Sequence, residues 1–349
     1  MQNILNILLI SIVSFGCSKK IQVSKFENDK YVNVKAFGAK GDGTTDDYQA
    51  ITLAVNYALK QKVNIYLPKG VYMLSKYFPI RNPVLKNPIL IDYKGLKILG
   101  DGENTIIKTK SQNGCDVFQL NAVKNLFLSN FTITADIDNP KPKSGSNAIS
   151  ITNGGEKISI NKVFCFDLPY VDKGNYLDGG KAFSIQPANT KNAVTHISIT
   201  NSKADNCAYG FGIDLHGDKY IQNQIGTVSV DSCQFNECIR GISMGASGNF
   251  SDIEDLEKVE SIISIENSII SDCEYGLFLV RLNKLKITRN YIKSNNFEEY
   301  IGIVLNGVVN SNISNNKIEC KIGITSSTTK TYSGRLIKSH NNNLANNKQ

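Results

Sequence analysis

The stretch Gly210-Phe211-Gly212-Ile213-Asp214-Leu215-His216 is one copy of a strand that recurs along the chain, and it carries reactive side chains that the other copies lack. In a β-strand, successive side chains point to opposite faces. The three apolar side chains therefore share the inward face, while the glycine at 212, Asp214 and His216 share the outward face. This stretch predicts both a structural repeat and a candidate site.

Related strands occur on both sides of this stretch, and a second strand precedes several of them. Strands of the first kind are Ala148–Thr152, Ala182–Gln186, Gly241–Gly245, Gly276–Val280 and Gly302–Asn306, and strands of the second kind include His196–Ile199, Thr227–Val230, Ile262–Ile265 and Lys284–Ile287. A short polar corner, often with the pattern Cys-x-x-Gly, joins the two strands. A unit that recurs every 20 to 50 residues or so cannot bury its own apolar face and needs stacked neighbours. The repeat predicts an all-β chain with one elongated domain, a right-handed parallel β-helix.

The chain is basic, with 39 Lys and Arg against 31 Asp and Glu and a formal net charge of +8 at pH 7. Such a balance favours acidic partners. The basic residues are dispersed, and no segment resembles a nucleic-acid-binding module. We therefore expect an acidic polysaccharide substrate and no nucleic-acid partner. We also expect a monomer.

The N-terminus is apolar over residues 1–16 and becomes polar directly after Cys17. The apolar segment is too short to span a bilayer and has the size of the apolar part of a secretory signal. Ser-Phe-Gly-Cys at 14–17 resembles the lipobox of bacterial lipoproteins, which implies a signal peptide over 1–17 and a lipid on Cys17. A simple secretory signal is the alternative. With a linker over 18–30, the resemblance implies a lipid-anchored protein of the bacterial cell envelope, at the outer membrane or cell surface.

Seven cysteines remain after Cys17, so they cannot all pair with one another. Stacked coils would bring equivalent cysteines about 4.8 Å apart, which favours a buried ladder of free thiols. The cysteines at this repeated position are Cys207, Cys238, Cys273 and Cys320. No Cys-x-x-Cys occurs, so we expect no zinc site.

Three motifs near the N-terminus follow one another: VKAFGAKGDGTTDD at 34–47, IYLPKGVY at 65–72 and LKILGDG at 96–102. Together they resemble the opening block of the pectate lyase superfamily, as found in rhamnogalacturonase-like, polygalacturonase-like and phage tailspike proteins. The resemblance implies that residues 31–325 form one pectate-lyase-like β-helix.

An amphipathic helix is predicted directly after the first motif. Asp46 or Thr45 would cap it, and Gln49 lies at the capping-box distance from Asp46. One apolar stripe contains Ile51, Ala54, Val55, Ala58 and Leu59. Such a helix would close the open end of the solenoid. The glycine-rich stretch 38–43 lacks the Gly-Lys-Ser/Thr ending of a phosphate loop, so its acidic residues are assigned to turns and capping.

Some segments do not follow the repeat. We expect loops at 135–145, 169–180 and 246–260, where a solenoid builds groove walls. Residues 326–349 are rich in Ser, Thr and Asn and are expected to form a polar cap or tail.

The candidate site centres on Asp214 and His216, with Lys181 and Arg240 at the starts of the neighbouring strands. Removal of the proton next to a uronic-acid carboxylate requires neutralisation of that carboxylate, a base and an acid. Lys181 or Arg240 would neutralise the carboxylate, and His216, tuned by Asp214, would be the base. Tyr209 would be the acid.

Residues 211–216 also look like the Tyr-Gly-x-Asp-Pro-His strand of mannuronan epimerases and related alginate-active β-helix enzymes. Phe211 replaces that family's catalytic Tyr, and Leu215 replaces its Pro. The resemblance implies lyase or C5-epimerase chemistry on a uronic-acid polymer. Tyr275 occupies the same Cys-x-Tyr-Gly position as Tyr209 without other site residues near it, so packing alone is an alternative explanation for both tyrosines.

Two other functions stay open: a polygalacturonase-like glycoside hydrolase and a non-catalytic glycan-binding β-helix. A hydrolase needs two carboxylates. The strand at 238–245 resembles a polygalacturonase strand, but Arg240 stands where those proteins have His. Hydrolysis would therefore need a loop carboxylate near Asp214, with Asp178, Asp205 or Asp218 as candidates. We expect no cofactor. Calcium stays a weakly supported alternative, because one outward carboxylate provides too few oxygen ligands unless loop residues add to it.

Overall fold

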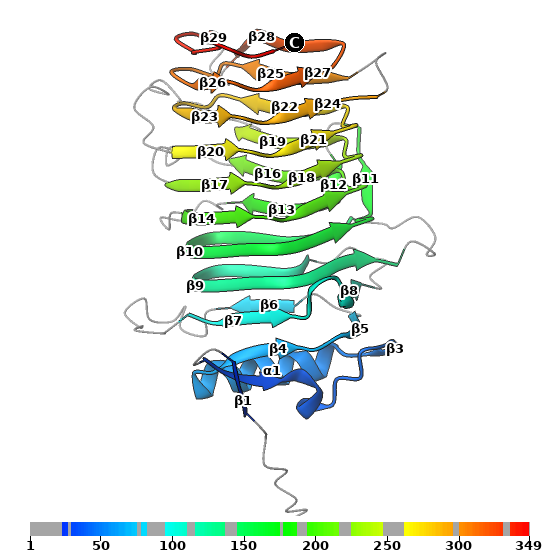
Figure 1. The fold of residues 1–349 in the computed structure, drawn as a ribbon. Helices are drawn as coiled ribbons and strands as arrows, with labels where there is room; N and C mark the ends of the chain where they lie inside the picture. The colour runs from blue at the N-terminus through cyan, green and yellow to red at the C-terminus, as the bar shows by residue number, and fades with distance from the viewer. Residues whose placement is uncertain are drawn as a thin grey trace, which may run out of the picture.

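The chain winds into an elongated stack of coils (Figure 1). The computed structural model describes residues 23–26, 29–74, 78–81, 95–109, 116–136, 145–174, 177–186, 194–215, 225–246, 262–295, 300–330 and 336–348. Helix α1, Tyr48–Gln61, lies at one end of the stack, and the C-terminus lies at the other. The predicted parallel β-helix with an N-terminal capping helix is confirmed.

Three parallel sheets run along the stack. They are called the first, second and third sheet, in the order in which each coil passes through them. The first sheet contains β2 (Asp29–Asn33), β4 (Asn64–Leu67), β7 (Lys97–Gly100), β14 (Val194–Thr200), β17 (Thr227–Asp231), β20 (Ile262–Glu266), β23 (Leu285–Thr288) and β26 (Asn312–Ser314). The second sheet contains β3 (Asp42–Asp46), β5 (Gly70–Leu74), β8 (Thr105–Thr109), β15 (Lys203–Asp205), β18 (Gln234–Asn236), β21 (Ile269–Ser271), β24 (Tyr291–Lys293) and β27 (Lys317–Glu319). The third sheet contains β6 (Phe78–Arg81), β13 (Lys181–Gln186), β16 (Tyr209–Leu215), β19 (Arg240–Ala246), β22 (Tyr275–Val280), β25 (Ile301–Asn306) and β28 (Ile322–Lys330).

Two long strands pass through all three sheets, β9 (Asp116–Ala135) and β10 (Asn147–Phe166). The remaining elements are β1 (Val23–Phe26), the hairpin strands β11 (Tyr170–Asp172) and β12 (Leu177–Gly179), β29 (Leu336–Lys338), and the 3-10 turns η1 (Val34–Phe37) and η2 (Gly102–Asn104). None of the helices within the described ranges is long and apolar enough to cross a membrane.

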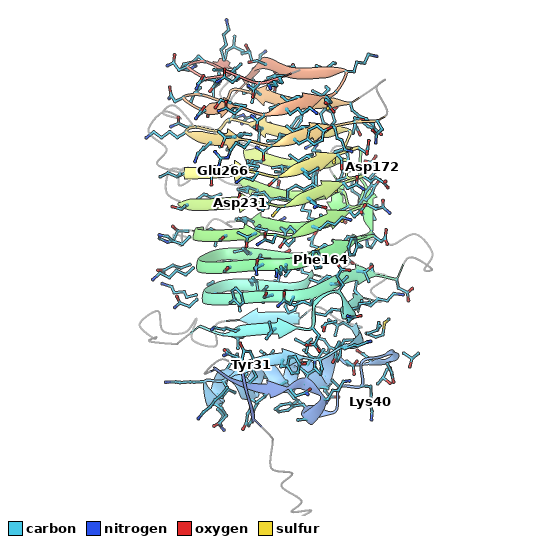
Figure 2. The ribbon with its side chains drawn as sticks, in the orientation of Figure 1. Tyr31, Lys40, Phe164, Asp172, Asp231 and Glu266 are labelled. Carbon is cyan, nitrogen blue, oxygen red and sulfur yellow. The ribbon has the colours of Figure 1, made fainter. Side chains whose placement is uncertain are left out.

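Neighbouring coils pair in register, so equivalent residues stack in columns. Phe211 pairs with Phe183 on one side and Ile242 on the other, and all three are buried in the core. Polar columns form in the same way, as Asp231 and Glu266 show on neighbouring coils of the first sheet (Figure 2). The alternation predicted for this strand is confirmed, with Phe211 inside and Asp214 outside.

The second sheet was missed by the sequence prediction, which placed only a polar corner there. Its strands after β10 have three residues each, and one side chain of each strand, such as Ala204 or Phe235, points inward. Three residues are too few to show an alternating pattern of apolar and polar positions.

The glycine of the Cys-x-x-Gly corner packs against the core. A Cβ atom at position 276 would lie 2.5 Å from the carbonyl oxygen of Gly302 and 2.6 Å from Cγ2 of Ile292. The pattern therefore marks a corner where only a hydrogen fits. The six cysteines in the described part of the chain are free. Of the four predicted for the buried ladder, Cys207, Cys238 and Cys273 are buried, whereas Cys320 is half-buried.

Helix α1 starts one residue later than predicted, with Asp47 as its N-cap and no side-chain capping bond. The Asp47 carboxylate instead accepts bonds from the backbone N–H groups of Lys40 and Gly41, at 2.6 and 2.9 Å. Asp46, one of the two predicted caps, accepts a bond from Tyr48 N–H in the first turn at 3.1 Å. The glycine-rich loop thus uses the carboxylate that would otherwise cap the helix.

The C-terminal segment 326–349 begins inside β28, which continues to Lys330. Residues 336–348 stack on the preceding coil, where Asn316 N–H donates to Oδ1 of Asn347 at 3.0 Å. This segment covers the end of the stack opposite α1.

The expected loop at 169–180 contains a hairpin of its own, because β11 and β12 pair antiparallel. Residues 137–144 and 247–260 of the other two expected loops lie outside the described residues. This hairpin borders the candidate functional site.

We predict that Gly276→Ala lowers the free energy of unfolding by about 1–3 kcal/mol, because the new methyl group overlaps Ile292 and the next coil. Urea unfolding followed by circular dichroism measures this change. Gly212→Ala is the matched control, since its Cβ would have no neighbour closer than 3.8 Å. Equal stability of the two variants would contradict the packing role of the corner glycine.

Candidate functional site

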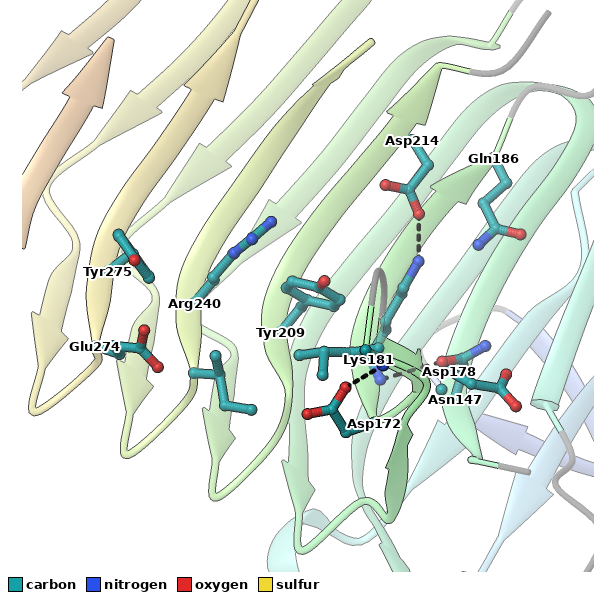
Figure 3. A pocket seen from close by; sticks show the side chains of 14 residues that line it. Asn147, Asp172, Asp178, Lys181, Gln186, Tyr209, Asp214, Arg240, Glu274 and Tyr275 are labelled. Carbon is teal, nitrogen blue, oxygen red and sulfur yellow. Dashed lines mark hydrogen bonds and ion pairs between the residues drawn. The ribbon is translucent and has the colours of Figure 1, made fainter. Parts of the chain in front are cut away.

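A cavity of about 750 Å³ lies on the outer face of the third sheet and is bordered by the hairpin β11–β12 (Figure 3). Strands from five neighbouring coils, β10, β13, β16, β19 and β22, contribute to its walls. Its charged and aromatic wall residues are Asp172, Asp178, Lys181, Tyr209, Asp214, Arg240, Glu274 and Tyr275. Four of the five predicted catalytic residues are therefore brought together, and the fifth, His216, lies outside the described residues.

Lys181, Tyr209 and Arg240 begin three neighbouring strands and pair in register. Strict alternation from Phe211 would turn Tyr209 inward. Tyr209 nevertheless lines the cavity, and a side chain at the next residue, Gly210, would overlap the ring of Phe235. Figure 3 shows the Tyr209 ring between Arg240 and Lys181.

Lys181 reaches across to the next coil, and its Nζ donates to Oδ2 of Asp214. The lysine side chain is 10% exposed and the aspartate side chain 26%. Lys181 N–H also donates to Oδ1 of Asn147 at 3.1 Å, which holds the strand start in place. This cation is thus engaged with the predicted site carboxylate.

Arg240 is held by aromatic rings. Its Cζ lies 4.1 Å from the ring centroid of Phe278, 5.5 Å from that of Tyr209 and 5.8 Å from that of Tyr275. Its Nη1 donates to Ser243 Oγ at 3.3 Å. Stacking on aromatic faces fixes the plane of a guanidinium and leaves its edge available for a carboxylate.

Burial raises the pKa of the Tyr209 phenol above its ordinary value, Arg240 opposes this rise, and Asp214 adds to it. The Nζ of Lys181 lies 5.3 Å from the centroid of the same ring. A phenol with a raised pKa is protonated at neutral pH, so this side chain is suited to donate a proton and unsuited to act as a base.

Further carboxylates lie across the cavity. In Figure 3, Asp172 and Glu274 lie on the other side of Tyr209 from Asp214, and Asp178 comes from the hairpin. The other two candidates for a second carboxylate do not join them. Asp205 belongs to the second sheet, where it accepts a bond from Asn236 at 3.0 Å, and Asp218 lies outside the described residues.

The sequence prediction missed several wall residues. Tyr275 was assigned to packing, but it lines the cavity next to Arg240, its register partner. Its shared Cys-x-Tyr-Gly position with Tyr209 was a usable signal. Asn147 and Gln186 also line the cavity, and their places beside Lys181 and Asp214 follow from coil register. Within the described ranges, no cluster of three or more His, Cys, Asp or Glu side chains is arranged to hold a metal.

An elongated parallel β-helix with a charged cavity on one sheet defines the class of protein. The family described as rhamnogalacturonase A/epimerase, pectate lyase-like matches residues 31–278, and the chain belongs to this family. The resemblance of the N-terminal motifs to the pectate lyase superfamily is therefore confirmed.

Known proteins resemble this chain in fold or in part of their sequence. The A-module of mannuronan C-5 epimerase AlgE6 from Azotobacter vinelandii superimposes with a TM-score of 0.56 and 17% identity, over 90% of this chain and 85% of that one. The pre-neck appendage protein of Bacillus phage phi29 is 29% identical over 153 residues, which cover 40% of this chain and 16% of that protein. Alginate lyase 7 of Azotobacter vinelandii is 54% identical over 44 residues, or 12% of this chain and 5% of that protein. The matched segments thus cover no more than 16% of these curated relatives.

We predict that Tyr209 ionises above about 10, the ordinary pKa of tyrosine, because burial disfavours the phenolate. The difference between the alkaline absorbance titrations of the wild type and Tyr209→Phe isolates this group. Arg240→Gln should raise the midpoint further, because it removes the nearby positive charge, whereas Arg240→Lys should preserve it. A midpoint below the ordinary value would contradict the burial of this phenol.

Proposed function

We propose that this protein modifies an acidic polysaccharide by abstraction of a proton next to a uronic-acid carboxylate, as a lyase or a C5-epimerase. The observation that carries the proposal is the position of the protonated Tyr209 phenol, between Arg240 and the Lys181–Asp214 pair in one cavity. This set supplies an acid and a cation side by side, and His216 follows two residues after Asp214.

The roles follow from the contacts. Lys181 is paired with Asp214, so Arg240 is the cation that neutralises the substrate carboxylate and acidifies the adjacent C5 proton. His216 takes that proton. In a lyase, the C4–O bond then breaks, a C4–C5 double bond forms, and Tyr209 protonates the leaving oxygen. In an epimerase, Tyr209 instead returns a proton to C5 from the opposite face.

The family and the names of the relatives support this proposal. The shared fold by itself does not specify a reaction. The names of the epimerase and the alginate lyase refer to mannuronan and alginate, which makes these uronate polymers the first substrates to test.

Glycoside hydrolysis is the second candidate, because Asp172, Asp178 and Glu274 line the same cavity as Asp214. Two carboxylates on either side of a glycosidic bond would be sufficient for that chemistry. The third candidate is a protein that binds a glycan without catalysis. In that case neither Tyr209 nor His216 would be needed for its function.

We predict that the mature chain, incubated with alginate, pectate, glycosaminoglycans and bacterial capsular polymers, raises the absorbance at about 235 nm or changes uronate stereochemistry. His216→Ala and Tyr209→Phe should each lower the rate about 100-fold or more, the usual effect of losing a general base or acid. Thr195→Ala, on the first sheet, is the control variant. New reducing ends without unsaturation would favour the hydrolase, and affinity without any product would favour a binding protein.

We also propose that the chain is lipid-anchored in a bacterial envelope through Cys17, which lies outside the described residues. The support is the Ser-Phe-Gly-Cys motif after an apolar segment.

For the anchor, we predict that the full-length chain expressed in a lipoprotein-processing bacterium sediments with membranes and carries fatty acyl groups on Cys17. Cys17→Ser should release it into the soluble fraction, whereas Ser18→Ala should not. Identical fractionation of wild type and Cys17→Ser, with no acyl mass on the N-terminal peptide, would contradict the anchor.

A further inference from the structure

The outward column that runs through the middle of the third sheet lacks a side chain at one place. In this column, Ser184 on β13, Gly212 on β16 and Ser243 on β19 are register partners. The neighbouring coils therefore carry a hydroxymethyl group where β16 carries only hydrogen. Gly212 lies two residues before Asp214 on β16 and shares its outward face, and Asp214 lines the cavity.

Neither the backbone nor the packing explains this glycine. Gly212 is not among the residues with a positive φ. A Cβ there would lie 3.8 Å from Ser243 O and 3.9 Å from Cδ of Lys181, both ordinary contact distances. The corner glycines differ, because at Gly276 a Cβ would lie within 2.6 Å of two core atoms.

The Lys181 side chain passes over this gap. Lys181 belongs to β13, whereas its partner Asp214 belongs to β16, so the side chain must cross from one coil to the next. The distance from Lys181 Cδ to the Cβ position of residue 212 places the aliphatic stem directly beside Gly212. On β19, Arg240 bonds Ser243 of its own strand, and its guanidinium lies over the ring of Phe278 on the next coil.

We propose that Gly212 is a positioning residue, and that its missing side chain is the path by which Lys181 reaches Asp214. A branched side chain at this position occupies the space of the lysine stem. Lys181 then leaves Asp214 without its cation, and the Tyr209 ring loses one of its two cationic neighbours. The ion pair itself is independent of the proposed function, whereas its effect on turnover rests on that function.

The test labels the intact folded protein with acetic anhydride and then digests it. Mass spectrometry of the peptides measures how fast the Lys181 amine is acetylated. In the wild type, Lys181 should react slowly, because its amine is buried and bonded. Gly212→Val should speed the reaction at least about fivefold, the factor equivalent to an ion pair of about 1 kcal/mol. Asp214→Asn, which removes the partner directly, gives the reference rate for a released lysine.

Two control variants separate the path from general disturbance. Gly212→Ala should keep the slow rate, since its methyl group fits at an ordinary distance. Ser229→Val adds a β-branched side chain to an outward position of the first sheet, far from Lys181 in the fold, and should also keep it. If Gly212→Val does not fold, as judged by circular dichroism, Gly212→Ser is used, with an expected rate between those of the alanine variant and Asp214→Asn.

Slow labelling of Lys181 in both Gly212→Val and Gly212→Ser would overturn the proposal, whatever the activity. Turnover adds a second arm when an active polymer is known. Gly212→Val should then reduce kcat in the wild type but not in a Lys181→Met background, because both changes remove the same interaction. Released Lys181 with unchanged turnover would leave the positioning role intact and would show that the ion pair does not contribute to turnover.

Discussion

The structure depends above all on the in-register pairing of each coil with the next. Because parallel strands pair at a spacing of about 4.8 Å, a residue on one coil meets its equivalents on the coils before and after it. Phe183, Phe211 and Ile242 stack in this way inside, and Asp231 and Glu266 stack outside. The same pairing leaves no room for a side chain at Gly276, where the corner touches Ile292.

The site is a consequence of this pairing. Lys181, Tyr209 and Arg240 are separated by about thirty residues of sequence from one to the next, yet register places them side by side. The protein thereby places two cations beside one phenol. The hairpin β11–β12 then adds the wall that turns a flat sheet into a cavity.

The two cations are held by different forces. Lys181 is bonded to a carboxylate, whereas Arg240 is stacked on Phe278, which leaves its charge uncompensated by any carboxylate among the described contacts. Between them, burial keeps the Tyr209 phenol protonated. An acid beside a cation whose charge is available to a ligand is an arrangement suited to a carboxylated sugar, and it distinguishes this face of the β-helix from the first sheet.

The repeat, the capping helix and the common patch of Asp214, Lys181, Tyr209 and Arg240 could be predicted from the sequence, because alternation and repeat register are local and periodic properties. The second sheet could not, since strands of three residues show no period, and the hairpin wall with Tyr275 depends on contacts between coils. Only the tertiary structure showed that Lys181 crosses to Asp214, whereas Arg240 stacks on Phe278 and bonds Ser243. The direction of a long side chain is set by the space that neighbouring coils leave, and that space exists only after the coils have stacked.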